Sequence, residues 1–220
     1  MADTKISALT ALTGAGTDAT ADVLPIVDTS AGATKKILVE ELGIALNATQ
    51  AAVDAGTATK SLIPPSLNKI SQLTEQAGAG TSLDFTIPTG TRQVIMMGVG
   101  VSTDGTSNWL VQLGDAGGIE TSGYLSSCGS SGGTTDATAG FLINKSNVAA
   151  VVYRFQLILN LEDASDFTWV GSSQLGGAGE AAQFQIGSKA TSQATTTIRL
   201  TTANGSDSFD AGFVNVNYIR

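Results

Sequence analysis

The stretch that decides the fold is Val148-Ala149-Ala150-Val151-Val152-Tyr153-Arg154-Phe155-Gln156-Leu157-Ile158-Leu159-Asn160-Leu161. Every second residue from 151 to 161 is apolar, and Arg154, Gln156 and Asn160 fall between them. Side chains alternate between the two faces of a strand, so one face is expected to be buried. It would consist of Val151, Tyr153, Phe155, Leu157, Leu159 and Leu161. The pattern predicts one strand of a two-sheet β fold.

The sequence on both sides of this stretch has the same character. Trp109 and Trp169 sit in strand-like alternation and are expected in the core. Gly, Asn, Asp and Ser separate the short apolar segments, as they do at turns between strands. The segments are 83–87, 92–101, 109–113, 122–128, 139–144, 167–170, 181–187, 194–202 and 211–219. So many short strands predict a mainly β protein whose residues 79–220 form a β-sandwich or jelly-roll head.

Residues 44–78 differ from the head and predict a short helical linker or stalk. After two prolines, Ser66 is a suitable N-cap, and Leu67, Ile70 and Leu73 share one face of the helix that follows. A helix of about three turns needs partners to persist. Two arrangements remain open: a linker helix that lies on its own domain, or a bundle of stalks around an oligomer axis.

Composition excludes several functions. The net charge is −8 and the chain has only 11 Lys and Arg, which argues against a nucleic-acid partner. The N-terminus lacks the basic flank and apolar core of a signal peptide, and no apolar run has the length of a membrane helix. We therefore expect synthesis in a cytoplasm, without Sec export or membrane insertion.

The sequence offers little catalytic chemistry. It has no histidine, and Cys128 has no basic neighbour to activate it. Two groups of carboxylates, Glu162-Asp163 with Asp166 and Asp207 with Asp210, suggest a hydrolase or a calcium site. Neither has the spacing of a calcium loop, which favours solvated loop acids. We expect no cofactor, no metal ion and no enzymatic activity.

Two parts of the chain resemble virion proteins of tailed bacteriophages. The run Lys5-Ile6-Ser7-Ala8-Leu9-Thr10-Ala11-Leu12-Thr13-Gly14, with residues 22–28, 34–37 and 41–42, resembles the N-terminal segment of many tail fibre and tailspike proteins. A second set of stretches is similar to a β domain that recurs at the tips of fibre-like proteins. It comprises residues 81–90, 106–108, 111–114, 121–124 and 198–212.

The resemblance implies an elongated homotrimer in the virion, made in the host bacterial cytoplasm. Residues 1–43 would anchor it, 44–78 would form the stalk through Leu67, Ile70 and Leu73, and 79–220 would face outward. The expected partners are other copies of the chain, tail, neck or capsid proteins, and a host surface glycan. The expected anchoring residues are Ile6, Leu9, Leu12, Leu24, Pro25, Ile26 and Val27.

Three functional classes follow. The favoured one is a short trimeric fibre of the tail or neck that displays an adhesion-type β domain. The second is a capsid decoration or head fibre protein, and the third is a glycan-active enzyme. Residues 44–78 are much shorter than a long fibre shaft, and no long β-helix is indicated. Both observations argue against a long fibre and against an enzymatic tailspike.

Overall fold

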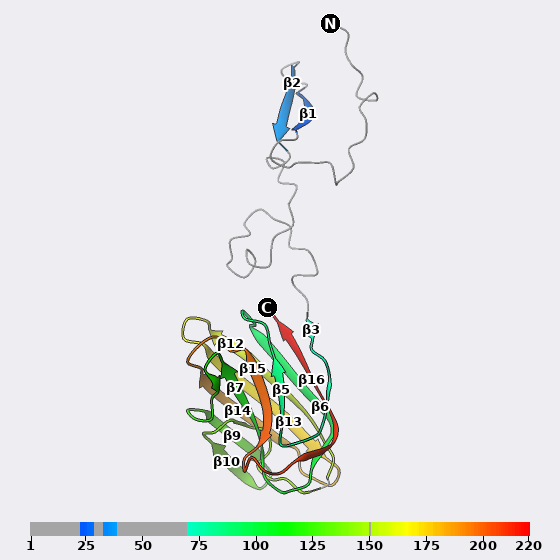
Figure 1. Ribbon diagram of the computed structural model, residues 1–220, viewed down its shortest axis with the longest axis vertical. Helices are drawn as coiled ribbons and strands as arrows, with labels where there is room; N and C mark the ends of the chain where they lie inside the picture. Colours follow the sequence, from blue (N-terminus) through cyan, green and yellow to red (C-terminus); the bar gives the residue numbers. More distant parts are fainter. Residues whose placement is uncertain (1–22, 29–32, 39–69, 150) are drawn as a thin grey trace. The chain divides into compact units, whose positions relative to one another are not determined.

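The computed structural model describes residues 23–28, 33–38, 70–149 and 151–220. The chain divides into one unit of residues 1–67 and a second of 68–220, called here the head. All regular elements of the described residues are antiparallel strands, and no helix occurs among them (Figure 1). In the first unit, β1 (Val23–Asp28) and β2 (Ala33–Leu38) form a two-stranded sheet.

The head consists of two sheets. The nine-stranded sheet has the order β10-β9-β14-β13-β12-β6-β16-β3, and β4 also pairs with β16. Its strands are β3 (Ser71–Gln72), β4 (Gln76–Ala77), β6 (Gln93–Thr103), β9 (Leu125–Ser130), β10 (Gly133–Ala137), β12 (Tyr153–Asp163), β13 (Thr168–Gly177), β14 (Gln183–Ala190) and β16 (Phe209–Ile219). The five-stranded sheet has the order β11-β7-β15-β5, and β8 pairs with β7. Its strands are β5 (Ser82–Thr86), β7 (Trp109–Asp115), β8 (Gly118–Ile119), β11 (Phe141–Leu142) and β15 (Thr197–Thr202).

One hydrophobic core lies between the sheets, and β12 contributes to it as predicted. Tyr153, Phe155, Leu157 and Leu159 are buried, whereas Val151 and Leu161 are only partly buried against the core. Both tryptophans are buried, which confirms the core prediction. The Trp109 ring of β7 meets the rings of three residues of the other sheet edge-on. The centroid distances are 5.4 Å to Tyr153, 6.1 Å to Phe155 and 5.6 Å to Phe209.

Glycines on the neighbouring strands make room for the large side chains of β12. Phe155 pairs with Gly98 of β6, Tyr153 pairs with Gly177 of β13, and Leu159 pairs with Gly171. A methyl group on Gly98 would lie 2.1 Å from Cε1 of Phe155, and one on Gly177 would lie 2.7 Å from the Tyr153 ring. The large inward residues therefore fit because their cross-strand partners lack side chains.

The predicted stalk helix is wrong for the residues that the structure describes. Residues 71–72 and 76–77 form β3 and β4, which pair with β16, and the Leu73 backbone N–H donates to Val216 O at 2.9 Å. Leu73 packs against the core, whereas Ile70 is 58% exposed. The edge of β16 offers unpaired backbone groups to an extended chain, and a lone short helix has no comparable partner. Leu67 lies outside the described residues.

The chain enters the head beside the C-terminus. Ser71 pairs with Tyr218, so Ile70 and Arg220 lie at one end of the head, called here the proximal end (Figure 1). The 11 residues of β16 span about 33 Å from the opposite, distal end. Six connections lie at the distal end, at residues 78–81, 104–108, 131–132, 143–149, 178–182 and 203–208.

Candidate binding surfaces

Hydrogen bonds join three of the distal connections to one another. In loop 143–149, Asn147 Nδ2 donates to Thr103 Oγ1 at 2.7 Å, Gly105 O at 3.0 Å and Ser107 O at 3.2 Å. Loop 203–208 is attached to loop 104–108 because the Ser208 N–H donates to Asp104 Oδ1 at 2.7 Å. The three loops therefore form one braced polar surface.

Asp207 is at the centre of this distal network. Its carboxylate accepts hydrogen bonds from Asn204 Nδ2 at 2.6 Å and from the Ser107 N–H at 2.9 Å. These two donors, the Asn204 side chain first, lower the pKa of Asp207. A methyl group on Gly105 would lie 2.0 Å from Asp207 Oδ2, so the close approach of the loops requires glycine there.

Three of the other carboxylates named by the sequence also accept hydrogen bonds from nearby groups of the chain. Asp163 Oδ1 accepts from the N–H and the hydroxyl of Ser165, each at 2.7 Å, and the hydroxyl is the main cause of its lowered pKa. Asp166 accepts from the Thr168 N–H at 3.0 Å, and Asp210 accepts from the Ser102 hydroxyl. In the part of the chain that the structure describes, no three Cys, Asp or Glu side chains form a group that could hold a metal ion.

Cys128 is buried on β9 and unsuited to nucleophilic chemistry. It packs with Leu110 and Leu142, and it forms no disulfide. Burial raises the pKa of its thiol, which keeps the thiol protonated at neutral pH.

A second candidate surface is the side of the nine-stranded sheet that faces away from the core, called here the outer face. Buried residues alternate along the strands with the residues of this face. Most outer-face residues are apolar, amide-bearing or small. On β6, β9, β12, β13, β14 and β16 the outer face comprises Gln93, Ile95, Met97, Val99, Leu125, Ser127, Gly129, Arg154, Gln156, Ile158, Asn160, Val170, Ser172, Gln174, Gly176, Phe184, Ile186, Ser188, Phe213, Asn215, Asn217 and Ile219.

The strand register aligns these residues in rows across the sheet. In one row Asn217, Ile95, Ile158, Ser172 and Ile186 follow one another on successive strands. A neighbouring row contains Met97, Gln156, Gln174 and Phe184, in which Gln174 Nε2 donates to Gln156 Oε1 at 3.3 Å. Ser127 of β9 pairs with Ile186 and adds a sixth strand to the first row, so the outer face is continuous across six strands.

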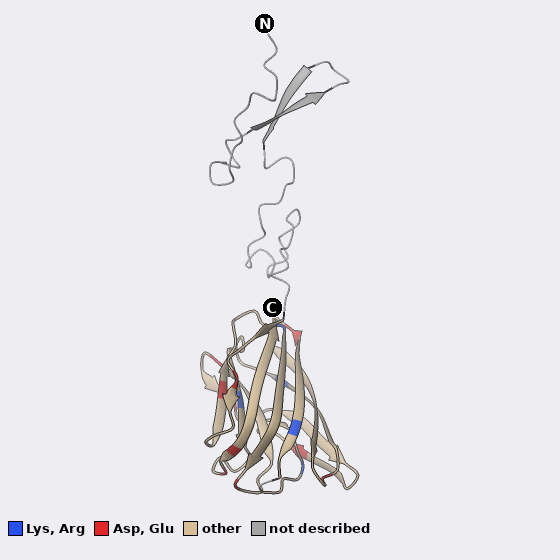
Figure 2. Cartoon of the chain, turned by 90° about the vertical axis from the view of Figure 1, so that its right-hand side faces the viewer, with Lys and Arg blue, Asp and Glu red and all other residues tan. Residues whose placement is uncertain are grey.

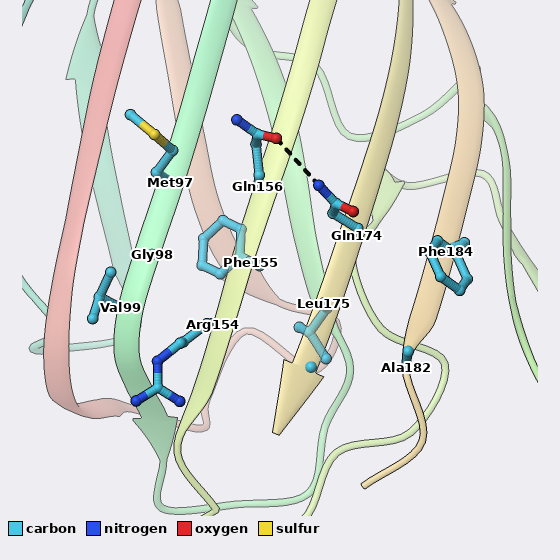
Figure 3. Close-up of a pocket in the computed structure, with 11 residues that line it drawn as sticks. Met97, Gly98, Val99, Arg154, Phe155, Gln156, Gln174, Leu175, Ala182 and Phe184 are labelled. Atoms are coloured by element: carbon cyan, nitrogen blue, oxygen red, sulfur yellow. Dashed lines mark hydrogen bonds between the residues drawn. The ribbon is translucent and has the colours of Figure 1, made fainter. Parts of the chain in front are cut away.

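A groove of about 560 Å³ crosses the distal half of the outer face (Figure 3). Met97 and Val99 line it on β6, Arg154 and Gln156 on β12, and Phe184 on β14. Gly98 and the largely buried Phe155 also line the groove. A second hollow of about 630 Å³ lies over Leu125, Val170 and Ile186.

Arg154 is the single charged residue of the outer face as defined above. Figure 2 looks onto the long strands of the head, which are tan over most of their length with isolated charged positions. Asp136 lies on the same side of the sheet, because it is opposite Ser127 on edge strand β10, and it lines the second hollow. The outer face is therefore almost neutral, although the chain has a net charge of −8.

Only some of the predicted anchoring and stalk residues are among the described residues. Leu24, Pro25, Ile26 and Val27 lie on β1, which pairs with β2. Ile6, Leu9 and Leu12 lie outside the described residues, so the anchoring role stays a prediction. For Ile70 and Leu73, the head pairing described above replaces the helical stalk face.

Comparison with protein-family models and with curated proteins gave no match. Among the residues with described structure, no helix has the length and apolar character to span a membrane. The proposals below therefore rest on the sequence and on the geometry of the two candidate surfaces.

Sequence reasoning missed the outer face. The available signals were the nearly unbroken apolar run 94–101 and the apolar residues Phe184, Ile186 and Phe213. These residues become neighbours only through a strand order in which β14, β13, β12, β6 and β16 are adjacent. That order connects segments more than 100 residues apart, and local periodicity does not contain it.

Proposed function

We propose that the chain is a structural protein of a bacteriophage particle, a short homotrimeric fibre of the tail or neck with an adhesion-type head. Under this proposal residues 1–43 attach it to the particle and the head has a jelly-roll fold. The resemblance in residues 5–14 and in the head stretches supports the phage origin. The antiparallel two-sheet head is consistent with a jelly roll.

The observation that carries the proposal is the position of the chain ends in the head. Ile70, through which the N-terminal unit continues, and Arg220 lie at the proximal end. The braced distal loops lie about 33 Å from Ile70, at the opposite end of the head. A display protein needs this arrangement, because recognition loops on a rigid sandwich must face away from the attachment point.

We propose that the distal loops bind a host surface glycan and do not cleave it. Their Asn, Ser and Asp groups are suited to hydrogen bonding with hydroxyl groups. Asp207, the carboxylate at their centre, has a lowered pKa and is held by Asn204 and Ser107. Glycoside hydrolysis requires one carboxyl group with a raised pKa beside an ionised one.

Incorporation into particles tests the structural role. Infected cells would express the full chain and a variant that lacks residues 1–43, and purified particles would be analysed by mass spectrometry. We expect only the full chain in particles, at a copy number that fits the few attachment sites of a tail or neck. A copy number that matches the capsomers would support the decoration protein instead, and absence of the full chain would refute a virion role.

Binding to host polysaccharide tests the role of the distal loops. We expect the full chain to be retained on immobilised polysaccharide without shortening it, and Asp207→Ala to weaken retention. Asp163→Ala is the matched control, because Asp163 also has a lowered pKa but lies at the proximal end of β12. Shortened polysaccharide, or equal loss in both variants, would contradict the proposal.

A further inference from the structure

The outer face exposes large apolar side chains over several adjacent strands. Leu125 is 74% exposed, Ile186 66% and Phe184 61%, and Val99, Val170 and Phe213 on the same face are also exposed. Single exposed apolar residues are common, but a continuous patch of them marks an interaction surface. The rows described above make this patch continuous, because neighbouring strands lie about 4.8 Å apart.

The charge distribution indicates which partner fits the outer face. Two copies of a chain with a net charge of −8 repel each other wherever acidic surfaces meet. On the six strands β9, β14, β13, β12, β6 and β16, the outer-face residues named above include no Asp or Glu, and their single charge is the positive Arg154. Asp136, opposite Ser127 on edge strand β10, adds one negative charge at the border of this area. A strongly charged partner would find little complementary charge there. A second copy meets a surface as neutral and as apolar as its own.

The dimensions also suit contact between copies. The outer face spans six strands that lie about 4.8 Å apart, and it extends about 20 Å along each strand. Its projected area is therefore on the order of 500 Å². The side chains project from this plane and expose a larger area than the projection. A standard protein interface buries about 800 Å² per partner, which is the same order.

We propose that the head associates with other copies of the chain through the outer face of the nine-stranded sheet. This inference rests on the proposed function, because it names the surface that would hold the homotrimer together. The amide rows would limit the possible registers, since each amide at the contact must find a hydrogen-bonding partner when it is buried. Contact through this face leaves the distal loops free for a ligand.

Two acidic substitutions in the full chain test the proposal by sedimentation velocity. Ile186→Glu and Val99→Glu each place an acid on the outer face, at side chains that are already largely exposed. We expect the wild type to be an oligomer and both variants to be monomers with unchanged circular dichroism. The matched control is Val148→Glu in a distal loop, where the side chain is 43% exposed, and it should remain an oligomer.

Thiol reactivity gives a second measurement that does not depend on acidic substitutions. Ser172→Cys places a thiol on the outer face, Ser131→Cys places one in a distal loop, and the native Cys128 is buried. In the oligomer, maleimide should label the thiol at position 172 at least tenfold more slowly than the thiol at 131. In the Ile186→Glu background the two labelling rates should become similar.

The possible failures are distinguishable. If both acidic variants keep the wild-type mass and position 172 reacts freely, the outer face is not the interface, whereas the homotrimer stands. A wild type that is monomeric at all concentrations would refute both the interface and the homotrimer, but not incorporation into particles. Protection of position 172 only in the presence of polysaccharide would overturn self-association and identify the face as a glycan site.

Discussion

The two sheets of the head differ on the sides that face away from the core. On the five-stranded sheet, Asp84 and Arg199 lie directly opposite each other and form two hydrogen bonds of 2.6 Å. Threonines 86 and 197 extend this polar surface. On the nine-stranded sheet the corresponding positions are mostly apolar, amide-bearing or small, with Arg154 on β12 and Asp136 on edge strand β10 as isolated charges.

This difference teaches that alternation alone does not identify the solvent side of a strand. Both sheets alternate buried and exposed positions. The five-stranded sheet has the outer composition of a solvated surface, whereas the nine-stranded sheet resembles a surface that something else covers. The predictions that follow test the core side of the larger sheet first and the solvated side of the head afterwards.

The largest effect is expected on the core side of β12. Phe155→Ala should lower the free energy of unfolding by about 3–5 kcal/mol, because it removes a buried ring beside Gly98 and leaves a cavity. Denaturant unfolding measures the change, with Thr86→Ala on the solvated face of β5 as control, expected within about 0.5 kcal/mol. An unchanged midpoint for Phe155→Ala would refute the core assignment.

Two adjacent glycines, Gly176 and Gly177, face opposite sides of β13 and allow the two sides to be compared. Gly177→Ala should cost about 1–3 kcal/mol of stability, because its methyl group would lie 2.7 Å from the Tyr153 ring. Gly176→Ala is the matched control, because a methyl group there meets nothing within 4 Å. Thermal unfolding of both variants provides the comparison, and equal losses of stability would contradict the inward packing of Tyr153.

The strands of the head could largely be predicted from the sequence, because period-two alternation records which side is buried. Tyr153, Phe155, Leu157 and Leu159 are buried as predicted. The same reasoning failed for residues 70–77, where Ile70 and Leu73 also fit helical spacing. In this segment the deciding factor was the free edge of β16, and pairing with a distant strand leaves no local periodicity.

The candidate surfaces were less predictable than the strands. The carboxylates of the distal loops were recognisable as loop acids, but the bond between Asp207 and Ser107 joins residues 100 positions apart. The outer face depends in the same way on strand order. We therefore regard loop composition as predictable and the joining of loops and strands into surfaces as a property of the topology.

A smaller effect is expected from the ion pair on the solvated side. A double-mutant cycle of Asp84→Ala and Arg199→Ala should give a coupling of roughly 0.2–1 kcal/mol, because water and salt screen an exposed pair. The coupling should decrease in high salt. Neither substitution should change the oligomer mass, and a change would show that the five-stranded sheet also contacts other copies.

The smallest effect concerns the distal loops and depends on pH. The pKa of Asp207 is lowered in the folded state, so its stabilising contribution is complete above the unfolded value near 3.9. That contribution is lost as the pH falls through the folded pKa. Asp207→Asn should therefore lower the melting temperature at pH 7 by a few degrees at most, and the difference should shrink as the pH falls below the unfolded value. A difference independent of pH would point to packing instead of charge.

The pairing of β3 and β4 with β16 has a mechanical consequence. Tension applied between the residues before 70 and the distal loops would act along β16, parallel to its length. Such a load acts in shear on all hydrogen bonds between β3 and β16 at the same time. A perpendicular load would instead open them one after another. A pulling experiment between these two points should thus detach a clamp of two short strands first, and the core between the sheets should break later.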